Sequence, residues 1–231
     1  MTRTITEPAR QIDVIRETEV LVVGSGPGGL PAALASARAG AETTLVERFG
    51  CFGGNLTVVG VEGMHWYRHE QTVESNGIAR EFEERAKAMG AAVPESQSLS
   101  HEIDSEGFKL VADALVQEAG IHPMLHRMFV APIMDGDSIT GIIVESKAGR
   151  EAILAQRVID ATGDADVAHR LRGRGARGSR GARRSRDRPG PDAREQHVGE
   201  RAVHRLAHHH GEQRARGADQ RAADDQRVVG Q

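Results

Sequence analysis

The chain has 231 residues and a formal net charge of −3, which is typical of one large soluble domain or two small ones. Its single cysteine, Cys51, excludes an intramolecular disulfide framework and cysteine-rich zinc or iron–sulfur sites within this chain. No apolar run reaches the length of a membrane span, and the polar first residues lack the apolar core of a secretion signal. We therefore expect a cytoplasmic protein with no membrane partner.

The composition of the chain changes after His169. Residues 1–169 carry 14 Lys and Arg against 25 Asp and Glu, whereas residues 170–231 carry 16 Arg, no Lys and eight acids. The later segment also lacks Ile, Phe, Met, Trp and Tyr, so it cannot bury enough apolar surface to offset its chain entropy. We predict an N-terminal extension over 1–17, a globular domain over 18–169 and a disordered tail over 170–231.

A strand–helix–strand unit opens the globular domain. Residues 18–24 read TEVLVVG, a short β-branched run that is typical of a buried strand. Residues 30–39 are rich in Ala and Leu and predict a helix, which ends at Gly40. Residues 42–47 (ETTLVE) predict a second strand, and the spacing suits a parallel crossover.

The next segment reads as an insertion before the third strand. Residues 49–63 are rich in glycine and predict a loop, and the polar residues 91–105 predict another. Apolar residues at helical spacing predict amphipathic helices over 78–89 and 107–119. We therefore treat residues 58–119 as a helical insertion.

Strand-like patterns dominate the rest of the globular part. A strand over 122–126 is followed by three short strands with hairpin turns between them, then by a return strand and the start of a helix. These elements are expected over 129–134, 138–145, 151–154, 156–160 and 165–169. The order predicts an α/β fold, Rossmann-like, with a parallel sheet and an antiparallel excursion.

The pattern G-x-G-x-x-G occurs at Gly24, Gly26 and Gly29, between the first strand and the first helix. Alone the pattern is equally typical of a flexible turn, but here Glu47 ends the next strand. Gly24 would permit the tight turn, Gly26 the approach of a pyrophosphate, and Gly29 close packing of helix and strand. The Glu47 carboxylate would accept hydrogen bonds from a ribose diol and repel a 2′-phosphate. These features predict a dinucleotide site that disfavours NADP.

Four pieces of sequence carry a family resemblance: VLVVGSGPGGLPAALASARAG, TLVER followed by GCFGGN, the helix before EAGI, and VIDATGDADVA. Together they span about residues 18–168. In them the chain resembles the FAD-dependent oxidoreductases of the glutathione-reductase-like superfamily, in the bacterial branch that includes the heterodisulfide-reductase A-like flavoproteins. The resemblance implies a Rossmann-like FAD-binding domain, FAD as cofactor, and redox transfer through the flavin between a small-molecule substrate and an electron partner. It also implies that the insertion 58–119 covers the flavin side.

The resemblance assigns cofactor-binding roles by position. They fall to Gly24, Ser25, Gly26, Pro27, Gly28 and Gly29 at the pyrophosphate, Glu47 and Arg48 at the adenosine ribose, Gly53, Gly54 and Asn55 toward the ribityl or flavin end, Val130 at the adenine, and Ala161, Thr162 and Gly163 closing over the cofactor. Without the first loop, the segment ATGD would be interpreted as an ordinary strand-to-helix turn with an N-cap aspartate.

No catalytic side chain and no metal site are predicted, because the chemistry of a flavoenzyme belongs to the cofactor. Cys51 lacks a partner for a redox pair and is interpreted as a small packed residue. His65 and His69 would share a face if helical, as a metal or acid–base pair, but a surface or substrate-pocket role fits equally. The tract His208–His210 resembles a fortuitous metal-binding run.

The tail 170–231 has two interpretations. Sixteen arginines suggest a nucleic-acid arm, but the absence of Lys and aromatics and the presence of eight acids argue against nucleic acid as a partner. The alternative hypothesis is out-of-frame translation of a GC-rich gene after a shift near His169, because Arg, Gly, Ala and Pro dominate the segment. Translating the coding DNA in the other two frames tests it: the hypothesis fails if neither frame continues the flavoprotein pattern.

The predicted function is that of a FAD-dependent oxidoreductase whose substrate domain is incomplete in this chain. Two alternatives remain open at this point. One is an inactive, truncated or frameshifted FAD-binding fragment, and the other is an NAD-dependent dehydrogenase, because the glycine loop alone does not separate NAD from FAD.

Overall fold

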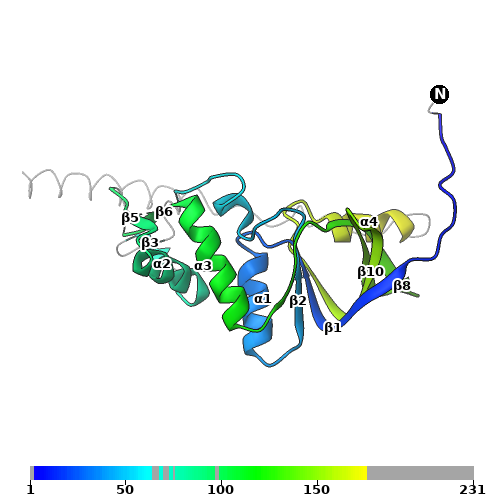
Figure 1. The fold of residues 1–231 in the computed structure, drawn as a ribbon, viewed down its shortest axis with the longest axis horizontal. Helices are drawn as coiled ribbons and strands as arrows, with labels where there is room; N and C mark the ends of the chain where they lie inside the picture. Colours follow the sequence, from blue (N-terminus) through cyan, green and yellow to red (C-terminus); the bar gives the residue numbers. More distant parts are fainter. Residues whose placement is uncertain (1–2, 64–67, 70–72, 75, 97–98, 176–231) are drawn as a thin grey trace, which may run out of the picture. The chain divides into compact units, whose positions relative to one another are not determined.

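The computed structural model describes residues 3–63, 68–69, 73–74, 76–96 and 99–175. A six-stranded sheet runs through this part of the chain in the order β7–β2–β1–β10–β9–β8 (Figure 1). The parallel strands are β1 (Asp13–Val23), β2 (Thr43–Val46), β7 (His122–Met124) and β10 (Gly149–Asp160), and the antiparallel pair β8 (Met128–Asp135) and β9 (Ser138–Ser146) extends the sheet beyond β10. The predicted α/β fold, with a parallel sheet and an antiparallel excursion, is confirmed.

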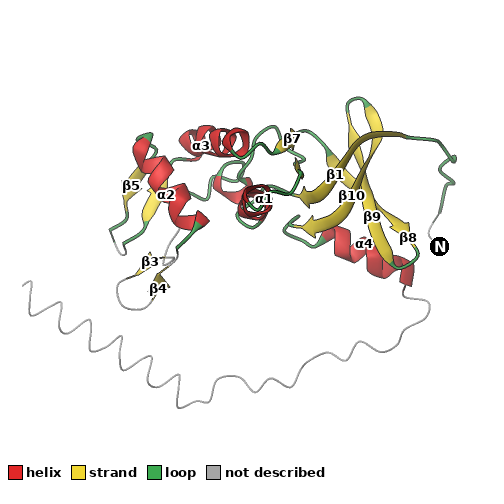
Figure 2. Ribbon diagram, turned by 90° about the horizontal axis from the view of Figure 1, so that it is seen from below, coloured by secondary structure: helices red, strands yellow, loops and turns green. Residues whose placement is uncertain are grey.

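Alternating side chains of β1 separate two apolar cores. Val22 faces one core together with Leu34 of helix α1 (Gly29–Arg38), and Leu21 faces the other. Val167 of helix α4 (Asp166–Gly175) belongs to this second core. The two faces of the sheet are therefore covered by different helices, as expected for strands buried on both sides (Figure 2). Because β1, β2 and β10 are parallel, the loops that follow them meet at one edge of the sheet.

The insertion contains helices and short strands. Helices α2 (Ile78–Ala88) and α3 (Ser105–Glu118) form where their apolar spacing predicted them, and the rings of Phe82 and Phe108 meet edge to face, with centroids 5.4 Å apart. Asp104 caps α3 by accepting hydrogen bonds from the amides of its first turn. The smaller elements are a 3-10 turn at Gly54–Leu56, β3 (Arg68–His69), β4 (Val73–Glu74), β5 (Ala92–Pro94) and β6 (His101–Ile103).

Some predicted boundaries were wrong. The expected loop 91–105 contains the antiparallel pair β5–β6, whose three-residue strands are too short to show a period of two. The expected strands 151–154 and 156–160 are one strand, β10, because Ala155 continues the ladder opposite Thr18. Strand β1 begins at Asp13, so part of the predicted extension 1–17 belongs to the sheet.

Helix α4 continues the fold past His169, and residues 176–231, including His208–His210, lie outside the described residues. Within the described ranges, no helix combines the length and apolar character needed to cross a membrane.

One ion pair between α1 and α2 gives a testable pH dependence. Nη1 and Nη2 of Arg38 donate to the two oxygens of the Glu81 carboxylate, at 2.6 and 2.8 Å. This hydrogen bonding holds the pKa of Glu81 below its ordinary value of 4.5. The pair therefore stabilises the fold above that value, and the stabilisation is lost as the pH falls through the lower pKa of the folded state. Glu81→Gln should lower the free energy of unfolding by at most about 1 kcal/mol at neutral pH, because the pair is partly exposed.

Urea unfolding of this variant and of wild type, above and below pH 4.5, measures the effect. We expect the two stabilities to converge at the acidic pH. Glu102→Gln, an exposed change at a carboxylate with no ion pair among the described residues, is the control. An unchanged gap between Glu81→Gln and wild type at both pH values would contradict the role of the pair.

Candidate functional site

The loop between β1 and α1 lies against the turn that follows β10. Gly24 has a φ of +94°, and a Cβ added to it would lie 2.5 Å from the carbonyl oxygen of Ala161. A Cβ on Gly29 would lie only 1.8 Å from the carbonyl oxygen of Gly24. Both positions therefore require glycine for backbone packing, as the spacing of the motif predicted.

Gly26 and Gly28 have a different environment, because a Cβ added to either would meet no protein atom within 4 Å. Among the described residues, no group accepts a hydrogen bond from their amides, and α1 has no side-chain cap at its N-terminus. Two unpaired N–H groups thus lie beside the positive end of the helix dipole, on residues with no side chain to cover them. This arrangement fits a diphosphate.

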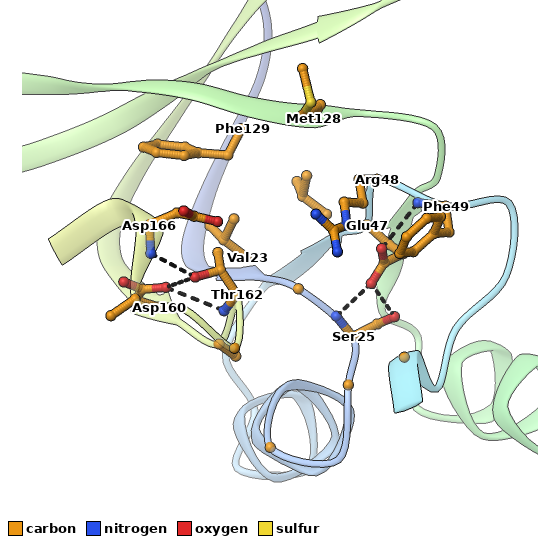
Figure 3. Close-up of a pocket in the computed structure, with 18 of the residues that line it drawn as sticks. Val23, Ser25, Glu47, Arg48, Phe49, Met128, Phe129, Asp160, Thr162 and Asp166 are labelled. Carbon is orange, nitrogen blue, oxygen red and sulfur yellow. Dashed lines mark hydrogen bonds between the residues drawn. The ribbon is translucent and has the colours of Figure 1, made fainter. Parts of the chain in front are cut away.

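The Glu47 carboxylate, at the end of β2, is turned toward this loop and is 5% exposed. Its Oε2 accepts hydrogen bonds from the amide and hydroxyl of Ser25, at 2.8 and 2.6 Å, and its Oε1 accepts one from the Phe49 amide at 3.0 Å (Figure 3). A carboxylate has about four acceptor positions, so about one remains for a ribose hydroxyl without rearrangement. Glu47 is thus prearranged by the loop, and its capacity to clasp both hydroxyls of a ribose is smaller than the sequence suggested.

Exposed and basic side chains flank Glu47. The guanidinium carbon of Arg48 lies 4.6 Å from the centroid of the Phe49 ring, a cation–π contact. Arg127 lies across from them at the start of β8, where it donates to Glu151 at 3.1 Å and to the carbonyl of Leu125 at 3.2 Å. Arg48 has no carboxylate partner among the described residues, so its charge is available to a ligand.

These groups enclose a cavity of about 690 Å³. Most of the predicted cofactor residues line it, namely Gly24, Ser25, Gly26, Pro27, Gly28, Glu47, Arg48, Gly54, Asn55, Ala161, Thr162 and Gly163. Several lining residues were not predicted from the sequence: Val23, Val46, Phe49, Val59, Arg127, Met128, Phe129, Asp160, Ala165, Asp166 and Arg170.

Three predicted residues are not among the lining residues. Gly29 is packed behind the loop, and Gly53 supports it by donating from its amide to the carbonyl of Ser25 at 3.0 Å. Val130 lies one residue beyond the lining pair Met128 and Phe129, where the pairing of β8 with β9 shifts register. The residues of β8 that line the cavity therefore precede the predicted one, and a count of strand positions cannot reveal such a register shift.

The remaining candidates lie away from the cavity or outside the described residues. The sulfur of Cys51 is partly buried, 3.9 Å from the hydroxyl of Thr57, and does not line the cavity. His65 lies outside the described residues, and only the backbone of His69 is described. In the part of the chain that the structure covers, no group of three or more His, Cys, Asp or Glu could hold a metal ion.

Comparison with known families decides which dinucleotide this fold uses. The family FAD dependent oxidoreductase matches residues 19–227, which is most of the chain. The chain belongs to the FAD dependent oxidoreductase family. The predicted cofactor, FAD, is thereby confirmed, and the NAD-dependent alternative is set aside. The family match also includes most of the Arg-rich segment 170–231.

Curated relatives of this chain include thiamine thiazole synthases. The protein from Metallosphaera sedula is 32% identical over 161 residues, which cover 64% of this chain and 55% of the relative. The Saccharolobus solfataricus protein is 31% identical over 165 residues, covering 65% of this chain and 57% of the relative. The chain therefore spans about half the length of the curated relatives it matches.

Solved structures resemble the chain to a lesser degree. Thermovibrio ammonificans THI4 is 22% identical with a TM-score of 0.49, and the match covers 69% of this chain and 63% of that one. The open conformation of a flavocytochrome c3 fumarate reductase is 24% identical with a TM-score of 0.45, covering 64% of this chain and 34% of the other.

The bond between Ser25 and Glu47 supports a first prediction about the site. The Ser25 side chain is fully buried, and its hydroxyl bond to a carboxylate is charge-assisted. Ser25→Ala should lower the free energy of unfolding by about 1–3 kcal/mol and weaken FAD binding, because the amide alone would then hold Oε2. Urea unfolding and FAD titration measure both effects. Ser36→Ala, which removes a hydroxyl that bonds to Ala32 on α1, is the control, and equal behaviour of the two variants would refute the prediction.

Proposed function

We propose that this chain binds the ADP part of FAD in the cavity and serves a flavin-dependent oxidation or reduction of a small-molecule substrate. The observation that carries the proposal is the convergence of three features on one cavity: the free amides of Gly26 and Gly28, the uncapped start of α1, and the prearranged Glu47 carboxylate. The first two features suit the diphosphate of an adenosine diphosphate, and the third suits its ribose.

The residues of the chain bind and orient the cofactor. The amides of Gly26 and Gly28 and the positive end of α1 would offset the charge of the diphosphate. The remaining acceptor position of Glu47 would take a ribose hydroxyl, and Arg48 would add positive charge at the rim. When bound, the flavin supplies the redox chemistry, so the chain needs no catalytic side chain of its own for electron transfer.

For the finer assignment, we propose the branch of the glutathione-reductase-like superfamily that includes the heterodisulfide-reductase A-like flavoproteins. The support is the order of the motifs, with VLVVGSGPGG before the helix, GCFGGN after the second strand and VIDATGD after the return strand. The structure brings residues from all three motifs to one cavity.

A second candidate function is synthesis of a thiazole. It is favoured by the curated thiamine thiazole synthases that are 31–32% identical to this chain. Expression of the chain in bacteria that need added thiazole for growth discriminates the two candidate functions. Growth without thiazole supports thiazole synthesis. Continued need for thiazole, in cells that make the folded flavoprotein, supports the redox function.

The main experiment isolates the full chain and identifies what it carries. We expect visible flavin absorbance and release of FAD, one per chain, on denaturation. Turnover with artificial electron acceptors then separates an active oxidoreductase from an inactive FAD-binding fragment. Binding of a nicotinamide dinucleotide with no affinity for FAD would overturn the proposal.

A further inference from the structure

A chain of hydrogen bonds organises the segment that follows β10. Oδ1 of Asp160 accepts from the amide and hydroxyl of Thr162, at 3.2 and 2.8 Å, and Oδ2 accepts from the Ala168 amide at 2.9 Å. The Thr162 hydroxyl in turn accepts from the Asp166 amide at 2.8 Å (Figure 3). One carboxylate and one hydroxyl thus join the end of β10, the turn 161–163 and the first turn of α4.

This segment forms part of the cavity wall. The Ala161 amide donates to the carbonyl of Val23 at 2.9 Å, which extends the β1–β10 ladder into the turn. The Ala161 carbonyl oxygen lies so close to Gly24 that no Cβ fits between them. The position of the turn therefore determines how the wall meets the glycine loop, where the diphosphate is proposed to lie.

The two helices that reach the cavity differ in their free amides. At the start of α4, the amides of Asp166 and Ala168 are already bonded to Thr162 and Asp160. At the start of α1, the amides of Gly26 and Gly28 find no acceptor among the described residues. Asp160 and Thr162 thus cap the start of α4, whereas the amides of Gly26 and Gly28 beside α1 stay free to bind an anion.

We propose that Asp160 is a positioning residue for the cofactor: acting through Thr162, its carboxylate holds the turn 161–163 in the wall of the cavity. The proposal rests on the proposed function, because it takes the cavity to hold the ADP part of FAD. The ordinary N-cap role that the sequence suggested for the aspartate of ATGD belongs instead to Asp160 and Thr162, since Asp164 makes no hydrogen bond among the described residues.

Loss of the negative charge and loss of the hydrogen bonds to the turn predict opposite effects of Asp160→Asn on ADP affinity. Asp160 lines the cavity, so its negative charge alone would repel a diphosphate, and its removal would tighten binding. An amide side chain, however, offers only one oxygen and cannot accept from both Thr162 and Ala168 in the same way. If position dominates, the variant binds ADP more weakly despite the loss of a repulsive charge.

The test titrates ADP and FAD into the full chain. We expect Asp160→Asn to weaken ADP binding about tenfold, since a hydrogen bond to a charged group is lost. Asp164→Asn removes the same charge from an exposed residue that does not line the cavity, and should not weaken binding. Equal or tighter ADP binding by Asp160→Asn than by wild type would overturn the proposal.

A second pair of variants covers the case in which Asp160→Asn fails to fold. Thr162→Val removes the hydroxyl at nearly constant volume and should weaken ADP binding, whereas Thr162→Ser keeps the hydroxyl and should restore it. Equal binding by these two variants would overturn the positioning role. If wild type binds neither ADP nor FAD, the proposed function itself fails; if wild type binds and the variants match it, only the role of Asp160 fails.

Discussion

Replacing Gly26 with valine is expected to abolish measurable FAD binding while the fold persists. A Cβ at this position meets no protein atom within 4 Å, so its addition disturbs no packing, and the valine side chain takes up space beside the free amide in the cavity that Gly26 lines. A diphosphate requires that same space, and we expect Kd to rise about a hundredfold or more. The melting temperature should change by less than about 4 °C, which corresponds to about 1 kcal/mol in a domain of this size.

FAD titration and thermal unfolding measure both quantities on one sample. Ala35→Val is the matched control, because it adds bulk to an exposed position of α1 that does not line the cavity. Normal FAD affinity in Gly26→Val would show that the diphosphate does not approach this amide.

Replacing Gly29 with alanine is expected to have a different profile, with a large loss of fold stability. Its Cβ would lie 1.8 Å from the carbonyl oxygen of Gly24 and 3.0 Å from the Cβ of Ala161. The Gly24 backbone cannot easily yield, because its amide donates to the carbonyl of Val46 at 2.8 Å. We expect the free energy of unfolding to fall by about 3 kcal/mol or more, at the upper end for overpacking.

Urea unfolding provides the measurement, and Gly28→Ala provides the control for the added methyl group. Gly28 has a φ of −92° and a ψ of −39°, and open space surrounds its added Cβ, so alanine should be tolerated there. A Gly29→Ala protein as stable as Gly28→Ala would contradict the close packing of the loop against the sheet.

The parts of the fold that could be predicted are those with a strong local pattern. The apolar run before Gly24, the helix after Gly29 and the amphipathic helix that contains Phe108 all form where their periodicity indicates. The glycine spacing predicted the loop. Gly24 and Gly29 are required because a Cβ would clash with backbone, whereas a Cβ on Gly26 would meet only open space.

The parts that could not be predicted depend on tertiary contacts. Arg127 and Phe129 line the cavity and Val130 does not, although the three residues are neighbours in sequence, and the pairing of β8 with β9 becomes irregular just after Phe129. The bonds of Asp160 to Thr162 and Ala168 require the turn to be folded already, so no spacing rule reveals them. The hydrogen bond from Ser25 to Glu47 could not be predicted either, because the motif assigns that carboxylate to a ribose.

The central claim is that the free amides of the glycine loop bind the diphosphate of FAD. The most direct measurement is a titration of the isotope-labelled full chain with ADP, following the amide resonances of Gly26 and Gly28 by NMR. We predict that both resonances shift and saturate with the same Kd as the ADP-binding isotherm, whereas the Gly136 amide, in the hairpin between β8 and β9, stays unchanged. Saturable ADP binding that leaves the Gly26 and Gly28 resonances in place would contradict the claim.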